Sequence, residues 1–187
     1  MVLDKNVLNL SLVLPNVRHI SIYDCYEAMV SFIQSMLSDV TDAIEAYEIV
    51  GSYCPGDYDL SIGGKKFAGI SQRRIKDAAA IQIYLDIAGN SQARAALVRD
   101  FYSVAIHGEP TKFTYPDIVP EKMASLSELL GKQMTVADMK NRAQQTLRKL
   151  SSEIVTPPFS EKEMRVFETR LAQMKKRNER IAVALGR

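Results

Sequence analysis

The chain has 187 residues, of which 47% are hydrophobic and 25% are charged, and these values are typical of a globular protein rather than a disordered one. Its formal net charge of +2 is too small to indicate a nucleic-acid partner. No apolar run is long enough to cross a membrane, and the N-terminus lacks the layout of a signal peptide. The two cysteines form neither a disulfide framework nor a zinc motif. We therefore expect a cytoplasmic protein without a metal.

The first predicted element is a strand in the segment VLNLSLVLP, which begins near Val7 and ends at a proline. Four leucines alternate along it and share one face: Leu8, Leu10, Leu12 and Leu14. A strand this apolar is typical of one with neighbours on both sides. Since few residues precede it, those neighbours must come from later in the chain or from sequence that is not present here.

The second predicted element is a helix that Ser21 caps, with Asp24 in the capping-box position. Apolar residues recur at helical spacing: Ile22, Tyr26, Met29, Ile33 and Leu37. Cys25 is in register with another apolar row, which contains Met29, Phe32 and Met36. We therefore expect Cys25 to be a buried core thiol, as cysteine commonly is.

Four predicted strands follow, in AYEIVGSY, DYDLSI, KKFAGISQRR and AAAIQIYLDI, the last with Ile81, Ile83 and Leu85 alternating. Gly63 and Gly64 are predicted to form a two-residue hairpin turn, because glycine adopts positive φ without steric cost. A turn of this length places Lys66 opposite Ser61 and Phe67 opposite Leu60.

Alternation along the returning strand puts Lys65 and Phe67 on one face, and Lys66 on the other with Ala68 and Ile70. A lysine among small and apolar groups is partly desolvated, and such lysines are uncommon unless they have a task. Ala68 and Gly69 are small enough to leave room for a ligand. The alternative is a lysine whose ammonium reaches water from the edge of the strand.

Cys54 follows a predicted strand and precedes the Pro55–Gly56 turn. A turn exposes its residues, whereas structural thiols lie mainly inside helices and strands. Lys66, on the following hairpin, could supply a cation that favours the reactive thiolate form. The residues alone leave two interpretations open: a nucleophile, or a small apolar residue that precedes a turn.

The remaining sequence predicts helices. Ser91 can cap the first, with Gly108 after its end, and its expected core face contains Leu97, Val98, Phe101, Val104 and Ala105. Further helices are expected near 121–130, 135–150 and 160–184. Thr135 can cap the second of these, and Ser160 with Glu163 forms a capping box for the third. A last apolar stripe is also expected to be core: Met164, Phe167, Leu171 and Met174. The fold class is α+β, with a mixed-sheet domain over 1–112 and a helical appendage over 113–187.

The segment GSYCPGDYDLSIGGKKFAGISQRR resembles the biotin/lipoate protein ligase family, and within it the octanoyltransferases that use the glycine cleavage H protein. KKFAG is similar to a family-wide feature, and SYCPG resembles the transferases, since the ATP-dependent ligases lack this cysteine. HGEPTKF and MASLSELLG are also similar, so the resemblance covers most of the chain. It implies a class II synthetase-like core.

The resemblance implies that Cys54 is the acyl-thioester nucleophile, and that Lys66 contacts the acyl carbonyl and favours the thiolate. It also implies that an octanoyl or lipoyl group passes from the glycine cleavage H protein to E2 lipoyl domains, and that neither a metal nor a nucleotide cofactor is needed. Residues around this pair are expected to bind the substrate: Gly51, Ser52, Tyr53, Ala68, Gly69 and Ile70. Arg73 and Arg74 are candidates for docking acidic lipoyl-bearing domains.

Members of this family carry an arginine- and glycine-rich motif and a histidine ahead of the first strand, so we expect this chain to begin inside the family's domain. Neither His19 nor His107 replaces that histidine, and both are expected to be structural or surface residues. Two alternatives stay open. One is an ATP-dependent lipoate ligase, distinguished by its need for ATP, and the other is an inactive fragment that binds lipoyl domains without a covalent adduct.

Overall fold

The structure is a computed structural model that describes the main chain of residues 2–184 and the side chains of residues 2–179. The chain forms two compact units, Met1–Leu150 and Ser151–Arg187. No helix in the described part of the chain is long and apolar enough to cross a bilayer.

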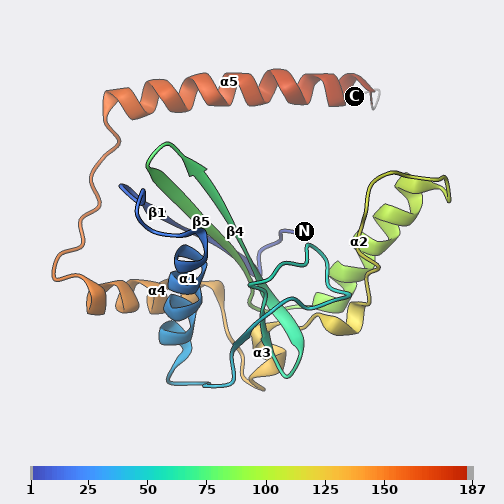
Figure 1. Cartoon of the computed structure of the whole chain (residues 1–187), viewed down its shortest axis with the longest axis horizontal. Coiled ribbons are helices and arrows are strands. Elements are labelled where there is room, and N and C mark those ends of the chain that lie inside the picture. Colours follow the sequence, from blue (N-terminus) through green and yellow to red (C-terminus); the bar gives the residue numbers. More distant parts are fainter. Residues whose placement is uncertain (1, 185–187) are drawn as a thin grey trace. The chain divides into compact units, whose positions relative to one another are not determined.

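The first unit is built on a five-stranded sheet in the order β1-β5-β4-β3-β2 (Figure 1). The strands are β1 (Val7–Leu14), β2 (Glu45–Ala46), β3 (Leu60–Ile62), β4 (Lys65–Ile75) and β5 (Ala78–Asp86). All their pairings are antiparallel, and one isolated parallel bridge joins Lys66 to Met123. The predicted α+β class is confirmed.

Strand β1 pairs with β5, so its neighbour does come from later in the chain. Among the residues that the structure describes, β1 is an edge strand of the sheet, so the expectation of a second neighbour from sequence outside this chain stays a prediction. Its four leucines are half-buried and pack against the main core, while Asn9, Ser11 and Val13 on the other face are exposed. One face of the strand is therefore covered and the other is open.

The first unit also contains α1 (Ile22–Leu37), α2 (Ser91–Ile106), a 3-10 helix η1 (Pro120–Lys122), α3 (Leu126–Leu129) and α4 (Val136–Leu150). Ser21 and Asp24 form the predicted capping box of α1. Cys25 is buried as expected, whereas Ile22, at the first turn, is exposed. Helices α1 and α4 pack together and against the sheet, and the main core lies between them and the strands (Figure 1).

The compact units do not follow the predicted division at residue 112. The segment 113–150 belongs to the first unit, because Leu126, Met134, Met139 and Ala143 contribute to the same core as α1 and the sheet. The predicted helix near 121–130 is two short pieces, η1 and α3, whereas the helix expected over 135–150 is observed as α4, with Thr135 accepting a hydrogen bond from the amide of Asp138.

The predicted core face of α2 is confirmed at Val98, which is half-buried against a second core cluster, and is wrong at the other positions. Leu97, Phe101 and Val104 are exposed, and the buried residues are Ser91, Arg94 and Ala95. The helix begins one residue earlier than expected, since the side chain of Asn90 caps it. Arg94 sets the orientation of α2, because its guanidinium forms ion pairs of 2.8 Å with Asp86 at the end of β5 and with Asp4.

The second unit contains α5 (Glu161–Ala184), and Ser160 and Glu163 form its predicted capping box. The expectation of a core stripe on this helix is not met within the unit. Met164, Phe167, Leu171 and Met174 are exposed, because α5 is the single helix among the described residues of that unit and has no second element to pack against.

Candidate functional site

The candidate site begins at the β3–β4 hairpin, where Gly63 and Gly64 have φ of 57° and 72° and form the predicted two-residue turn. Ile62 pairs with Lys65 and Ser61 with Lys66, as expected. The next pair is Leu60 with Ala68, so the prediction that Phe67 lies opposite Leu60 is wrong. Phe67 is the extra residue of a β-bulge, which changes the side-chain alternation of β4.

The bulge corrects the predicted faces of β4. Phe67 and Ala68 both belong to the main core, and Ile70 packs against that core. Lys66 lies instead on the face of Gly69, where a methyl group added to the glycine would be 3.3 Å from Lys66 Cε and 2.7 Å from a ring carbon of Tyr84. Gly69 is therefore required for the close approach of the lysine to Tyr84, because these two side chains occupy the space that a larger side chain at this position would need.

The predicted strand AYEIVGSY is wrong beyond Ala46, because residues 47–59 form a loop. Asp59 organises it. One carboxylate oxygen of Asp59 accepts hydrogen bonds from the amide of Ile49 at 3.3 Å and from the hydroxyl of Ser52 at 3.5 Å. Its main-chain N–H donates to Gly56 at 3.0 Å, and its carbonyl accepts from Tyr47 at 3.1 Å. These contacts satisfy main-chain groups that a strand would have paired with a neighbour.

Lys66 enters this loop from β4 and is 0% exposed. Its ammonium forms an ion pair of 2.8 Å with the other carboxylate oxygen of Asp59. It also donates to the carbonyl oxygens of Cys54 at 2.9 Å and Tyr53 at 3.0 Å, and lies 3.2 Å from the hydroxyl of Ser52. A lysine ammonium has three donors, and four oxygen atoms surround this one. The alternative of a lysine that reaches water is therefore wrong.

Cys54 is exposed at the outer side of the same loop, ahead of Pro55. Its φ is +49°, a conformation that residues other than glycine adopt rarely and that is disfavoured by the Cβ atom. Such conformations persist where the surroundings fix the backbone, and they are common at functional sites. Here the fixing groups are on both sides of the peptide chain: the ammonium of Lys66 holds the carbonyls of Tyr53 and Cys54, and Val119 donates to Gly51 at 2.8 Å.

Burial dominates the electrostatics beneath Cys54. It lowers the pKa of the Lys66 ammonium and raises the pKa of the Asp59 carboxyl, while their mutual attraction opposes both changes. Burial also raises the pKa of Tyr53 to about 12 and that of Tyr84 well above its usual value. The rings of these tyrosines stack at 5.9 Å, and Lys66 Nζ lies 5.9 Å from the Tyr84 ring centroid. Both phenols are therefore neutral, and Lys66 and Asp59 are the adjacent ionic groups.

A shallow groove continues from this site along the open face of the sheet. It has a volume of about 190 Å³ and crosses three strands. Its lining includes Asn9 and Ser11 of β1, Gly69 and Ser71 of β4, and Gln82 and Tyr84 of β5. Since Gly69 and Tyr84 also contact or approach Lys66, the groove ends beside the lysine.

The structure brings together several of the residues that the sequence predicted for the site. Ser52, Tyr53, Cys54 and Lys66 are in direct contact, and Gly51, with a φ of 87°, is the preceding loop residue. Their predicted substrate-binding roles remain predictions, as does that of Gly69. Ala68 is completely buried in the main core and Ile70 packs on it, so the structure places these two away from the open face.

The predicted docking pair is divided. Arg73 is exposed, but Arg74 is half-buried and donates to the carbonyls of Ile20 and Ser21 at 2.8 and 2.7 Å. It also lies 3.3 Å from the sulfur of Cys25. Arg74 therefore joins β4 to the start of α1, and only Arg73 keeps the features of a docking residue. His19 and His107 are both exposed, as expected.

Two residues of the site were missed at the level of sequence, Asp59 and Tyr84. Asp59 had a detectable signal. It lies directly before an apolar strand and seven residues before Lys66, so its carboxylate is able to pair with the lysine across the hairpin. Tyr84 had no comparable signal, since it is one aromatic residue in an apolar strand, and only the bulge in β4 brings Lys66 to its face.

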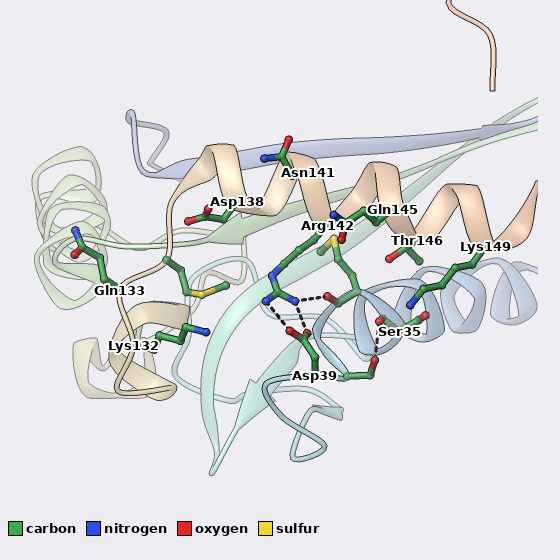
Figure 2. Close-up of a pocket in the computed structure, with 13 residues that line it drawn as sticks. Ser35, Asp39, Lys132, Gln133, Asp138, Asn141, Arg142, Gln145, Thr146 and Lys149 are labelled. Carbon is green, nitrogen blue, oxygen red and sulfur yellow. Dashed lines mark hydrogen bonds and ion pairs between the residues drawn. The ribbon is translucent and has the colours of Figure 1, made fainter.

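A second groove, with a volume of about 620 Å³, lies elsewhere, between α1 and α4 (Figure 2). Arg142 crosses its floor and donates to Asp39 and, at 3.2 Å, to the carbonyl of Met36. These contacts connect the two helices. Among the residues that the structure describes, no three His, Cys, Asp or Glu side chains gather so as to hold a metal ion.

Comparisons with known proteins identify the family of the chain. Residues 1–148 match the lipoyl protein ligase A/B catalytic domain family. The chain is 60% identical over 177 residues to an octanoyl-[GcvH]:protein N-octanoyltransferase from Oceanobacillus iheyensis, and the match covers 95% of this chain and 63% of the relative. It is 43% identical to a lipoyl-[GcvH]:protein N-lipoyltransferase from Listeria monocytogenes, covering 96% and 65%. The chain thus spans less than two thirds of these relatives.

Solved structures share the fold. A bi-partite lipoate protein ligase from Thermoplasma acidophilum has a TM-score of 0.58 at 16% identity, covering 86% of this chain and 58% of that one. A lipoate-protein ligase A has a TM-score of 0.59 at 15% identity, covering 85% and 58%. At these identities the likeness concerns the fold alone, and the family match over residues 1–148 decides the assignment. The chain belongs to the lipoyl protein ligase A/B catalytic domain family.

Proposed function

We propose that this chain carries the nucleophilic part of an octanoyltransferase, which moves an octanoyl group from a lysine of the glycine cleavage H protein to a lysine of an E2 lipoyl domain. Cys54 would hold the acyl group as a thioester between the two steps. The names of relatives that are 60% and 53% identical support the reaction class. The single structural observation that supports it best is the exposed thiol of Cys54 on a loop anchored by the buried ammonium of Lys66.

The proposed reaction exchanges one amide for another through a thioester. In the first step, the Cys54 sulfur forms a bond to the carbonyl carbon of the octanoyl-lysine amide, the carbon–nitrogen bond breaks, and the departing amine takes the proton that the thiol has lost. In the second step, the amine of the acceptor lysine forms the new amide, the carbon–sulfur bond breaks, and a proton returns to the sulfur. No co-reactant enters this balance, and no ATP is needed because the donor is already acylated.

Negative charge develops on the carbonyl oxygen of the donor in the first step, and this oxyanion needs positioned donors. Main-chain N–H groups of the loop segment 51–54 and the ammonium of Lys66 are the candidates. Lys66 already has four oxygen atoms within 3.2 Å. It would therefore have to release one of these partners, or act through the field of its charge, which the buried setting strengthens.

The name of the Listeria monocytogenes relative favours a second acyl group, lipoyl, on the same donor protein. Both groups present the same amide to Cys54, so the proposed chemistry does not change. An assay should therefore include octanoylated and lipoylated H protein side by side.

The experiment that tests the proposal is a transfer assay without nucleotide. Octanoylated H protein, an unmodified E2 lipoyl domain and the chain are mixed, and the masses of both acyl-carrier proteins are followed. The expected result is loss of the octanoyl mass from the donor and its gain by the acceptor with wild type, and neither change with Cys54→Ala. Transfer that needs ATP would contradict the proposal in favour of a ligase, and transfer by Cys54→Ala would exclude the thioester.

A further inference from the structure

The contacts of Asp59 carry an inference that deepens the proposed function and rests on it, because it takes Cys54 as the nucleophile. We infer that Asp59 is the positioning residue of the nucleophile loop: it keeps Lys66 charged and in place, and Lys66 in turn holds the backbone of Cys54. Asp59 forms an ion pair of 2.8 Å with Lys66, so the effect inferred for it on Cys54 is exerted through the lysine.

The carboxylate of Asp59 has contacts on both of its oxygens. Its two oxygens have separate tasks, since one accepts from Ile49 and Ser52 in the loop and the other pairs with Lys66 at 2.8 Å. Asp59 is 1% exposed and Lys66 is 0% exposed, so water does not compete for these contacts. The carboxylate thus links the start of the loop to the lysine on β4.

The charge of the lysine decides how many hydrogen bonds it can donate. A neutral amine has two N–H donors, whereas the ammonium has three and forms stronger hydrogen bonds to carbonyl oxygens. Burial favours the neutral amine, and Asp59 opposes this effect as the adjacent anion. The other titratable groups near Lys66 are Cys54 and Glu48 in or beside the loop and Tyr84 on β5. Asp59 is the carboxylate that forms an ion pair of 2.8 Å with the lysine.

The ammonium is connected to the nucleophile through the main chain. Lys66 donates to the carbonyls of Tyr53 and Cys54, which flank the main-chain N–H and the positive φ of Cys54. A rarely adopted backbone conformation at an exposed residue needs such fixing contacts. Removal of the Asp59 charge should therefore weaken both carbonyl contacts and loosen the backbone that presents the Cys54 sulfur.

The test uses Asp59→Asn, which keeps the size of the side chain and removes its charge, and Asp57→Asn as the matched control, because Asp57 is an exposed carboxylate of the same loop. The readout is the rate at which iodoacetamide alkylates Cys54, located by peptide mass mapping, with buried Cys25 as an internal reference. This probe requires no acyl substrate. The measurement is repeated across a pH range, after circular dichroism has shown that each variant is folded.

The expected result is a wild-type to Asp59→Asn rate ratio that rises with pH to roughly tenfold, because burial lowers the pKa of Lys66 and the variant's lysine, without the opposing charge of Asp59, loses its proton at a lower pH than in wild type. Asp57→Asn should match wild type throughout. An equal rate at every pH, or a reduction by the same factor at every pH, would overturn the inference, because a merely structural role does not depend on the charge of the lysine.

Should Asp59→Asn fail to fold, Asp59→Glu carries the test, since it keeps the charge and moves it by one methylene. The expected result is slower alkylation with a ratio to wild type that does not vary with pH, and an unchanged rate would overturn the inference. The outcome is separable from the proposed function. A pH-dependent alkylation-rate ratio without any octanoyl adduct on Cys54 would support the role of Asp59 and reject the transferase. An octanoyl adduct together with a ratio that does not vary with pH would support the transferase and reject the role of Asp59.

Discussion

Lys66 and Cys54 are connected through the main chain, because the ammonium of Lys66 donates a hydrogen bond of 2.9 Å to the carbonyl oxygen of Cys54. The lysine is buried and the thiol is exposed, so one contact joins the interior of the sheet to the candidate nucleophile at the surface. Asp59 holds the lysine from the other side at 2.8 Å. The predictions below follow from this arrangement and from the elements that support it.

Breaking the buried pair should destabilise the fold. Lys66→Met leaves the carboxylate of Asp59 buried without its cation, and we expect a loss of about 3–5 kcal/mol in the free energy of unfolding. The measurement is urea denaturation followed by circular dichroism. Lys65→Met, at the exposed neighbouring position, is the matched control and should change stability by about 0.5 kcal/mol or less.

A double variant separates two contributions to the loss of stability in Lys66→Met: the lost attraction between Asp59 and Lys66, and the cost of a buried carboxylate without a cation. Asp59→Asn combined with Lys66→Met removes both charges, so it should be less destabilised than Lys66→Met alone. A double variant that loses as much stability as the sum of the two single variants would contradict the account, because it would mean that the two side chains do not interact.

Gly69→Ala should disturb the same site by crowding. The added methyl would lie 2.7 Å from a ring carbon of Tyr84 and 3.3 Å from Lys66 Cε, so one of these buried side chains must move. We expect a loss of about 1–3 kcal/mol in the free energy of unfolding, together with slower alkylation of Cys54. Gly56→Ala is the control, since its methyl would meet Asp59 Oδ1 at an ordinary 3.9 Å. Equal stability of Gly69→Ala and wild type would show that the site is less closely packed than described.

The decrease of the free energy of unfolding at acidic pH should depend in part on Asp24. Hydrogen bonds from the hydroxyl and amide of Ser21 lower the pKa of this carboxyl in the folded state, so its contribution is present above the pKa of the unfolded chain and is lost as the pH falls through the lower, folded value. The stability difference between wild type and Asp24→Asn should therefore be largest at neutral pH and shrink in acid.

Denaturant midpoints of both proteins, measured from about pH 7 to about pH 2, check this expectation. Glu27→Gln, which changes an exposed carboxylate of the same helix, serves as the control. A difference between wild type and Asp24→Asn that stays constant into acid would mean that the capping contact stabilises α1 without its charge.

Sequence patterns predicted the parts of the fold that local chemistry determines. Positive φ at Gly63 and Gly64 places the hairpin turn, and Ser21 with Asp24 places the start of α1. The same patterns failed where distant contacts decide. Tyr47 and Ile49 favour a strand by composition, but hydrogen bonds to Asp59 hold their main chain in a loop.

The candidate site was predicted in part for the same reason. Cys54 and Lys66 were identified, and a two-residue turn does place Lys66 opposite Ser61. Regular alternation then put Lys66 on the face of Ala68, whereas the bulge at Phe67 moves Ala68 into the main core and leaves Lys66 beside Gly69. Alternation of period two contains no information on a bulge, because the extra residue is decided by how Phe67 packs in the core.

The most direct test of the central claim is an intact mass spectrum of this chain after mixing with octanoylated glycine cleavage H protein, beside Cys54→Ala. The account predicts one added octanoyl group on wild type, removed by hydroxylamine as a thioester and absent from Cys54→Ala. An adduct that persists in Cys54→Ala would contradict the account by placing the acyl group elsewhere. The absence of any adduct on folded wild type would likewise contradict the claim that this chain itself carries out the first step.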